Sequence, residues 1–237
     1  MFGYGLFLNP TYLLFMAPAF LLMLAVQWYV KSSYNKWSQV PARSRITGAQ
    51  AAQRLMRSGG LHDVRVESVP GDLTDHYDPR TKVLRLSPGV YQGASVASMA
   101  IAAHELGHAL QDHEGYLPLR FRAAIVPVVN IGSYLGWILI IIGMLIRATE
   151  LAWLGVAVFA GGAVFALATL PVELNASARA KRLLFETGLI VGDDEQRGVS
   201  TVLNAAALTY VAALITAVLQ LLYYAMLVMG MGGRRRS

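Results

Sequence analysis

Four long apolar runs are the feature that most constrains how this chain of 237 residues can fold. A helix needs about 20 apolar residues to cross the hydrocarbon core of a bilayer, and each run reaches that length. They extend over residues 11–30, 123–146, 151–172 and 205–230. Because backbone polar groups in lipid must be satisfied within the segment, we expect four transmembrane α-helices and a multi-pass protein whose partner is a lipid bilayer.

Composition supports a membrane protein and excludes several other classes. Only 14% of the residues are charged, against about 25% in an average soluble domain. The net charge of +6 comes mostly from Lys and Arg beside the apolar runs, which favours anionic lipid over nucleic acid as the partner. The chain has no cysteine, which excludes disulfides, a cysteine nucleophile and thiolate metal sites.

The charge distribution predicts the topology. The first run has no basic region before it and is followed by Lys31 and Lys36, so we interpret it as a retained anchor with the N-terminus outside. Basic residues near the span ends are most numerous in residues 31–122 and 173–204, which predicts that both segments are cytoplasmic and that the membrane is the inner (plasma) membrane. The three arginines of the tail, Arg234 to Arg236, would lie outside in this topology, contrary to the rule that basic residues lie on the cytoplasmic side.

The expected domain organisation follows from these spans. The segments are an N-terminal anchor at 1–30, a cytoplasmic domain at 31–122, two transmembrane helices at 123–172, a cytoplasmic helix at 173–204, and a last transmembrane helix with the basic tail at 205–237.

Residues 31–122 have the pattern of a small α+β domain. A helix is predicted from Thr47, which would cap it, to Ser58, before two glycines. Three segments are predicted as strands, and a second helix would begin at Ser95 or Ser98. The strands and this helix are expected at 64–69, 73–77, 82–87 and 94–112, with a hairpin turn at 78–81.

The second predicted helix carries the chemistry, in the motif His104-Glu105-Leu106-Gly107-His108. Residues four apart share a helix face, so both imidazoles can reach one Zn²⁺ ion. Glu105 would lie beside the ion, where it can take a proton from a metal-bound water. With only five histidines in the chain, such a motif rarely arises by chance, and we expect one zinc ion per chain.

Glu173 is the best candidate for a third zinc ligand. His113 points away from the face of the other two histidines, and Glu150 falls on the wrong side of the membrane. Glu173 directly follows the third apolar run and would open a helix in which Ala176 and Ala180 allow a close approach to the histidine helix. The alternative is an ordinary acidic residue at a helix N-terminus.

These motifs resemble the small bacterial membrane zinc metallopeptidases of the YugP type. The resemblance rests on the H-E-x-x-H motif and the segments 171–177, 73–79 and 205–211, and it extends over nearly the whole chain. It implies an α-helical membrane protein with four transmembrane helices and a small α+β cytoplasmic zincin-like domain. It also implies zinc on His104, His108 and Glu173. Larger gluzincins have Asp where this chain has Ser177, so the partner that orients a histidine stays open between Ser177, Asn175 and another residue.

The expected reaction is hydrolysis of a peptide bond, with Glu105 as the general base. A second donor is needed for the oxyanion; His76 is the preferred candidate, and Tyr77, Arg179 and Tyr210 are the others. An extended substrate could pair with the strand at 82–87. From the location of the site we expect the substrates to be loops, tails or unfolded segments of membrane proteins, as in membrane-protein quality control.

Three other functions remain open at this point. One is an intramembrane protease of the site-2 type, although residues 90–111 are rich in alanine rather than leucine. A second is a catalytically silent zinc-binding scaffold, and a third is a transporter, which the absence of charges in the last three spans disfavours. The last two need no general base, so the presence of Glu105 favours the peptidase.

Overall fold

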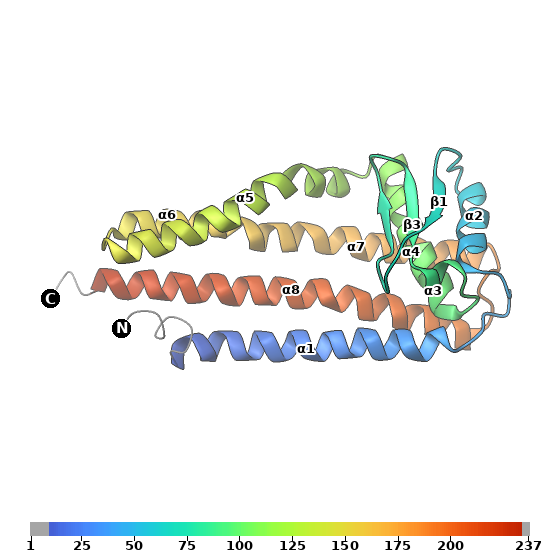
Figure 1. Cartoon of the computed structure of the whole chain (residues 1–237), viewed down its shortest axis with the longest axis horizontal. Helices are drawn as coiled ribbons and strands as arrows, with labels where there is room; N and C mark the ends of the chain where they lie inside the picture. Colours follow the sequence, from blue (N-terminus) through green and yellow to red (C-terminus); the bar gives the residue numbers. More distant parts are fainter. Residues whose placement is uncertain (1–9, 234–237) are drawn as a thin grey trace. The chain divides into compact units, whose positions relative to one another are not determined.

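The structure is a computed structural model that describes residues 10–233 (Figure 1). The chain divides into two compact units. In the described residues, one unit contains residues 10–26, 121–170 and 209–233, and the other contains residues 27–120 and 171–208. The basic tail predicted at 234–236 lies outside the described residues.

Five helices carry the predicted spans, and their bounds are α1 Pro10–Ser38, α5 Leu117–Leu145, α6 Thr149–Phe159, α7 Gly161–Glu186 and α8 Asp193–Gly233. The third span comprises both α6 and α7, with Ala160 between them. Among the described residues, four helical stretches are long and apolar enough to cross a membrane. Only 11–22% of the positions in their most apolar windows are buried in the protein. An apolar surface of this extent fits lipid and not water, which confirms the membrane-protein class.

The apolar unit packs through small residues and aromatic rings. A Cβ atom on Gly136 in α5 would lie 2.6 Å from the backbone nitrogen of Phe159 in α6, so these two helices touch through their backbones. The Tyr12 ring meets the Tyr223 ring edge-on at 5.2 Å. Phe159 meets Tyr224 in the same way at 5.0 Å.

The other unit contains a three-stranded sheet of order β1-β3-β2, made by β1 Arg65–Ser68, β2 His76–Asp78 and β3 Val83–Leu86. β1 is parallel to β3, and β2 is antiparallel to β3 with Tyr77 opposite Leu84. The predicted turn after Asp78 is confirmed, because its carboxylate accepts hydrogen bonds from the Arg80 backbone and the Thr81 hydroxyl. Residues 73–75 precede the strand, and Leu73 adopts a φ of 55°.

Three helices lie wholly within this unit: α2 Gly48–Ser58, α3 Pro88–Tyr91 and α4 Val96–His113. Thr47 caps α2 in a reciprocal box with Gln50, as expected. Of the two predicted caps for α4, Ser95 is the N-cap, and its hydroxyl accepts from the Ser98 backbone. One side of α4 is the centre of the core, where Val96, Met99, Ala103, Leu106 and their neighbours are fully buried. His104 and His108 lie on the opposite side of α4.

Two expectations about these elements are wrong. The strand at 82–87 was expected to offer an edge to a substrate, but β3 is the central strand and both its edges are occupied. The outer strands of the sheet are therefore β1 and β2. Glu173 was expected to open a helix, but it lies within α7, which begins at Gly161, so the explanation as an acid at a helix N-terminus does not apply.

Candidate metal centre

His104 and His108 lie one turn apart on the side of α4 that faces away from the hydrophobic core. Their rings meet edge-on with centroids 4.9 Å apart. Each side chain is about one-eighth exposed, at 12% and 13%. A helix rigidly packed on one side thus holds two imidazoles at a fixed spacing on the other.

Glu173 comes from α7, which approaches α4 closely. Ala176 and Ala180, expected to lie on the same face as Glu173, are both fully buried. A Cβ atom on Gly107 of α4 would lie 2.5 Å from the Ala176 carbonyl oxygen, so small residues line this contact. The Glu173 side chain is only 3% exposed. A carboxylate buried to this degree needs charged or hydrogen-bonded partners to offset its desolvation.

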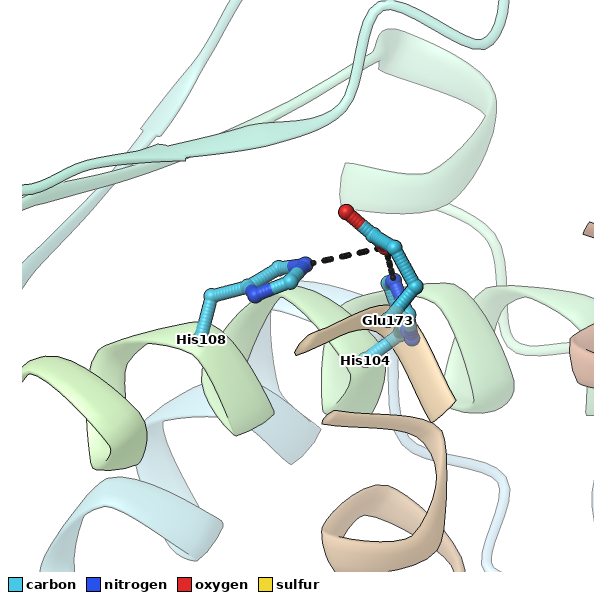
Figure 2. A group of neighbouring side chains, drawn as sticks. All are labelled: His104, His108 and Glu173. Atoms are coloured by element: carbon cyan, nitrogen blue, oxygen red, sulfur yellow. Dashed lines mark hydrogen bonds and ion pairs between the residues drawn. The ribbon is translucent and has the colours of Figure 1, made fainter. Parts of the chain in front are cut away.

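The partners of Glu173 are the two histidines (Figure 2). Its Oε2 atom lies 3.2 Å from His104 Nε2 and 3.3 Å from His108 Nε2. One ligand atom from each of the three residues lies within 4.8 Å of the others, and the group could hold a metal ion. The three predicted metal residues are therefore brought together.

The spacing of these atoms fits zinc. With bonds of about 2.0–2.2 Å in a tetrahedral arrangement, neighbouring ligand atoms are roughly 3.3 Å apart. The observed separations of 3.2 and 3.3 Å match this value. Two imidazoles and one carboxylate leave a fourth position for a water or substrate, as in catalytic rather than structural zinc sites.

Both imidazoles are oriented through their other ring nitrogen. Nδ1 of His104 lies 3.1 Å from the Ser177 hydroxyl, and Nδ1 of His108 lies 3.0 Å from Oε1 of Gln111. Of the partners that the sequence left open, Ser177 contacts His104. Gln111 was not predicted, although its position three residues after His108 on one helix face is the signal that could have identified it. Both contacts leave Nε2 directed at the group.

Glu105 lies beside the group rather than in it. Its Oε2 accepts a hydrogen bond of 3.1 Å from the backbone N–H of Tyr77 in β2. Burial raises the pKa of the Glu105 carboxyl, while the neighbouring histidines oppose this shift. The pKa of His108 is also raised: burial would lower it, but the hydrogen bond to Glu173, the charges of Glu105 and Glu173 and the hydrogen bond to Gln111 together outweigh burial.

The Tyr77 side chain connects β2 to the end of α4. Its hydroxyl donates to Asp112 at 2.9 Å, and Lys82 pairs with the same carboxylate oxygen. Burial and the bond to Asp112 raise the pKa of the Tyr77 phenol. The phenol is therefore engaged away from the metal group, and Tyr77 directs its backbone N–H toward the site.

The other residues considered as oxyanion donors lie in different environments. The His76 ring is exposed, and its Nδ1 lies 2.8 Å from the Thr74 carbonyl, so its role stays a prediction. Arg179 binds Asn175 and Glu114. Tyr210 belongs to the apolar unit.

Comparisons with known proteins identify the family of the chain. Residues 12–229 match the sequence model of a family described as "putative neutral zinc metallopeptidase". The chain belongs to this family. It is also 47% identical, over 201 residues, to the "Putative membrane protease YugP" of Bacillus subtilis (strain 168), covering 85% of this chain and 89% of that relative. No solved structure matches the chain. The expected resemblance to the YugP type is thus confirmed, and zinc is the metal that the family implies for the group.

Proposed function

We propose that the protein is an integral-membrane zinc-dependent endopeptidase that hydrolyses peptide bonds in segments of membrane proteins at the cytoplasmic face. The observation that carries this proposal is the convergence of His104, His108 and Glu173, with Glu105 adjacent to them but outside the ligand set. A scaffold needs only the first three residues. The placement of a fourth, ionisable side chain beside an open coordination position favours catalysis.

We assign the three residues to one zinc ion per chain, which would supply a Lewis acid and an activated water. Glu105 takes the proton of the attacking water and delivers it to the leaving amine. A carboxyl with a raised pKa suits both steps, because it can hold a proton between them. The charge of a bound ion would oppose this rise, which keeps the carboxylate ionised before attack.

The free edge of β2 offers a place for an extended substrate. Tyr77 uses its N–H to bind Glu105 and not β3, so this edge faces the catalytic group. Main-chain hydrogen bonds to such an edge recognise any extended peptide with little dependence on side chains. His76, on the same strand, is our candidate for the second oxyanion donor.

The membrane supports the choice of substrate. Glu173 directly follows the apolar run 151–172 in the sequence. A residue one position beyond a spanning segment lies close to the membrane surface, where loops and unfolded segments of membrane proteins are available. The excess of basic residues in 31–122 and 173–204 supports a cytoplasmic site, an N-terminus outside and a location in the inner (plasma) membrane. We propose the segment 31–122, with residues 173–204, as the zincin-like domain.

An intramembrane protease of the site-2 type is the second candidate. Within residues 10–233, α4 is not among the helices apolar and long enough to span a membrane. It lies in the core of the unit that also contains the sheet. Both observations disfavour a metal-binding helix in lipid.

The deciding experiment is digestion of a denatured model protein by the full chain purified in detergent. Wild type, Glu105→Gln and a chelator-treated sample are compared, with zinc content measured for each. Cleavage by wild type alone, with zinc retained in Glu105→Gln, supports the proposal. Zinc bound without cleavage of either this protein or an unfolded membrane-protein segment would favour the scaffold instead.

A further inference from the structure

We infer that Arg179, Asn175 and Gln111 form a hydrogen-bonded relay that fixes the tautomer of His108 and leaves its Nε2 lone pair free for the metal. The inference rests on the proposed function only in taking the ion to be zinc. It assigns a positioning role to three residues outside the ligand set, two of them on α7 and one on α4.

The relay begins at Arg179, which can donate hydrogen bonds but cannot accept them. Its Nε donates to Oδ1 of Asn175 at 2.7 Å. The guanidinium is held from its other side by Glu114 at 2.6 Å and lies 5.8 Å from the Tyr116 ring centre. A fixed donor therefore requires that the oxygen of the Asn175 amide, and not its nitrogen, faces Arg179.

The middle of the relay is Gln111, whose side chain is fully buried. Its Nε2 donates at 3.0 Å to Asn175 Oδ1 and at 2.8 Å to the Val172 carbonyl. Both partners are acceptors, and a backbone carbonyl cannot donate under any protonation state. The nitrogen of the Gln111 amide must face these oxygens, because the reverse orientation would place oxygen against oxygen.

The orientation of Gln111 then determines the proton on His108. Oε1 of Gln111 can only accept, so Nδ1 of His108, 3.0 Å away, must carry the hydrogen. A neutral imidazole with a proton on Nδ1 has its lone pair on Nε2. This Nε2 atom is the one that lies 3.3 Å from Glu173 Oε2 and faces the metal position. The other tautomer would point an N–H at the metal.

His104 provides the contrast. Its Nδ1 faces the Ser177 hydroxyl, which can donate or accept and so tolerates either tautomer. Of the two histidines, only His108 has a partner whose own hydrogen bonds permit a single position for the Nδ1 proton. The relay also joins α7 at Val172 and Asn175, on either side of Glu173, to α4.

Zinc affinity of the full-length protein, measured by competition with a chelator, tests the relay. Gln111→Met keeps the length of the side chain and removes every hydrogen bond, and we expect roughly a 10–100-fold weaker affinity. Ser98→Ala is the matched control, because Ser98 is a buried polar residue of α4 that bonds Ser95 and the Gly89 carbonyl. Its zinc affinity should equal that of wild type.

A second pair of variants keeps the test independent of how Gln111→Met folds. Asn175→Asp retains an oxygen that accepts from both Arg179 and Gln111, whereas Asn175→Leu retains none. We expect Asn175→Asp to bind zinc like wild type and Asn175→Leu to bind it several-fold more weakly. Equal affinities in these two variants would contradict the relay.

Nitrogen-15 labelled histidine supplies a spectroscopic readout on the zinc-bound protein. The hydrogen-bonded Nδ1 proton of His108 should be protected from exchange in wild type and Ser98→Ala, and should exchange rapidly in Gln111→Met. A protected proton with wild-type zinc affinity in Gln111→Met would overturn the inference. A wild-type protein that binds zinc but cleaves no peptide would overturn the proposed function and leave the relay intact.

Discussion

Gly107 of α4 and Ala176 of α7 lie so close that a Cβ atom on Gly107 would stand 2.5 Å from the carbonyl oxygen of Ala176. No real Cβ atom tolerates this distance from a backbone oxygen, and backbone cannot move aside as a flexible side chain can. The glycine in the H-E-x-x-H motif is thus the point at which the helix with the histidines meets the helix with Glu173.

Gly107→Ala should therefore separate the two helices and weaken zinc binding. Inserting one methyl group into a packed contact costs about 1–3 kcal/mol, and displacing Glu173 from the histidines should lower the zinc affinity at least tenfold. Chelator competition measures the affinity. Gly230→Ala is the control, because Gly230 lies in α8 and a Cβ atom there would meet nothing within 4 Å. Equal zinc affinities of Gly107→Ala and wild type would contradict this account of the contact.

Substitution of Glu105 should separate metal binding from catalysis. Glu105→Gln keeps an oxygen that can accept from the Tyr77 backbone but cannot take a proton at neutral pH. We expect cleavage of a denatured protein to fall by at least about 10²–10⁴-fold, the usual contribution of a general base, with the zinc content unchanged. Glu186→Gln, an exposed acid at the end of α7, is the matched control and should cleave like wild type. Retained cleavage in Glu105→Gln would exclude Glu105 as the base.

Much of the site could be predicted from local sequence. The motif spacing places His104 and His108 on one face of any helix, and the alanines after Glu173 predict a close helix contact, which the close approach of Gly107 to the Ala176 backbone confirms. The cap of α2 and the turn after Asp78 also depend only on neighbouring residues, so both were predicted correctly.

Features that depend on tertiary pairing were not predictable in the same way. Whether a strand is central or at an edge depends on which strands pair with it, and these can be distant in the sequence. Here β1 pairs with β3 although β2 lies between them in the sequence. The start of α7 was also predicted wrongly, because the third apolar run and the helix that carries Glu173 were treated as separate elements, whereas α7 continues from one into the other through Pro171. Gln111 escaped notice because its partners, Val172 and Asn175, lie more than sixty residues away.

The raised pKa of Tyr77 predicts a loss of stability in alkaline solution. Its phenol is protonated in the folded protein at a pH where a free tyrosine, with a pKa near 10, has begun to ionise. Above about pH 10 the unfolded state binds fewer protons than the folded state, so the free energy of unfolding should decrease as pH rises. Tyr77→Phe should remove this part of the decrease. Thermal midpoints of both proteins between pH 8 and 11 measure it, and parallel pH curves for the two would contradict the prediction.

Removal of zinc should abolish cleavage without unfolding the domain. Without an ion, Glu173 can accept hydrogen bonds from Nε2 of His104 and from Nε2 of His108 in its protonated form, at 3.2 and 3.3 Å. The raised pKa of His108 favours that form, so the three side chains satisfy one another. The apolar core around Leu84, Met99 and Leu106 lies on the other side of α4 and does not involve the ligands. A chelator should therefore leave the helical circular dichroism unchanged while lowering the thermal midpoint, since zinc at 100 times its Kd stabilises the folded state by about 2.7 kcal/mol.

Glu173→Gln provides the control for zinc removal. Its neutral amide is a far poorer zinc ligand than the carboxylate, so its thermal midpoint should respond little to zinc or to a chelator, whereas wild type should recover both its midpoint and its cleavage when zinc is restored. If the chelator instead abolished the helical signal of wild type, the domain would need zinc in order to fold, and the prediction would be contradicted. The separation of ligands from core on opposite faces of α4 would then be insufficient to keep the domain folded.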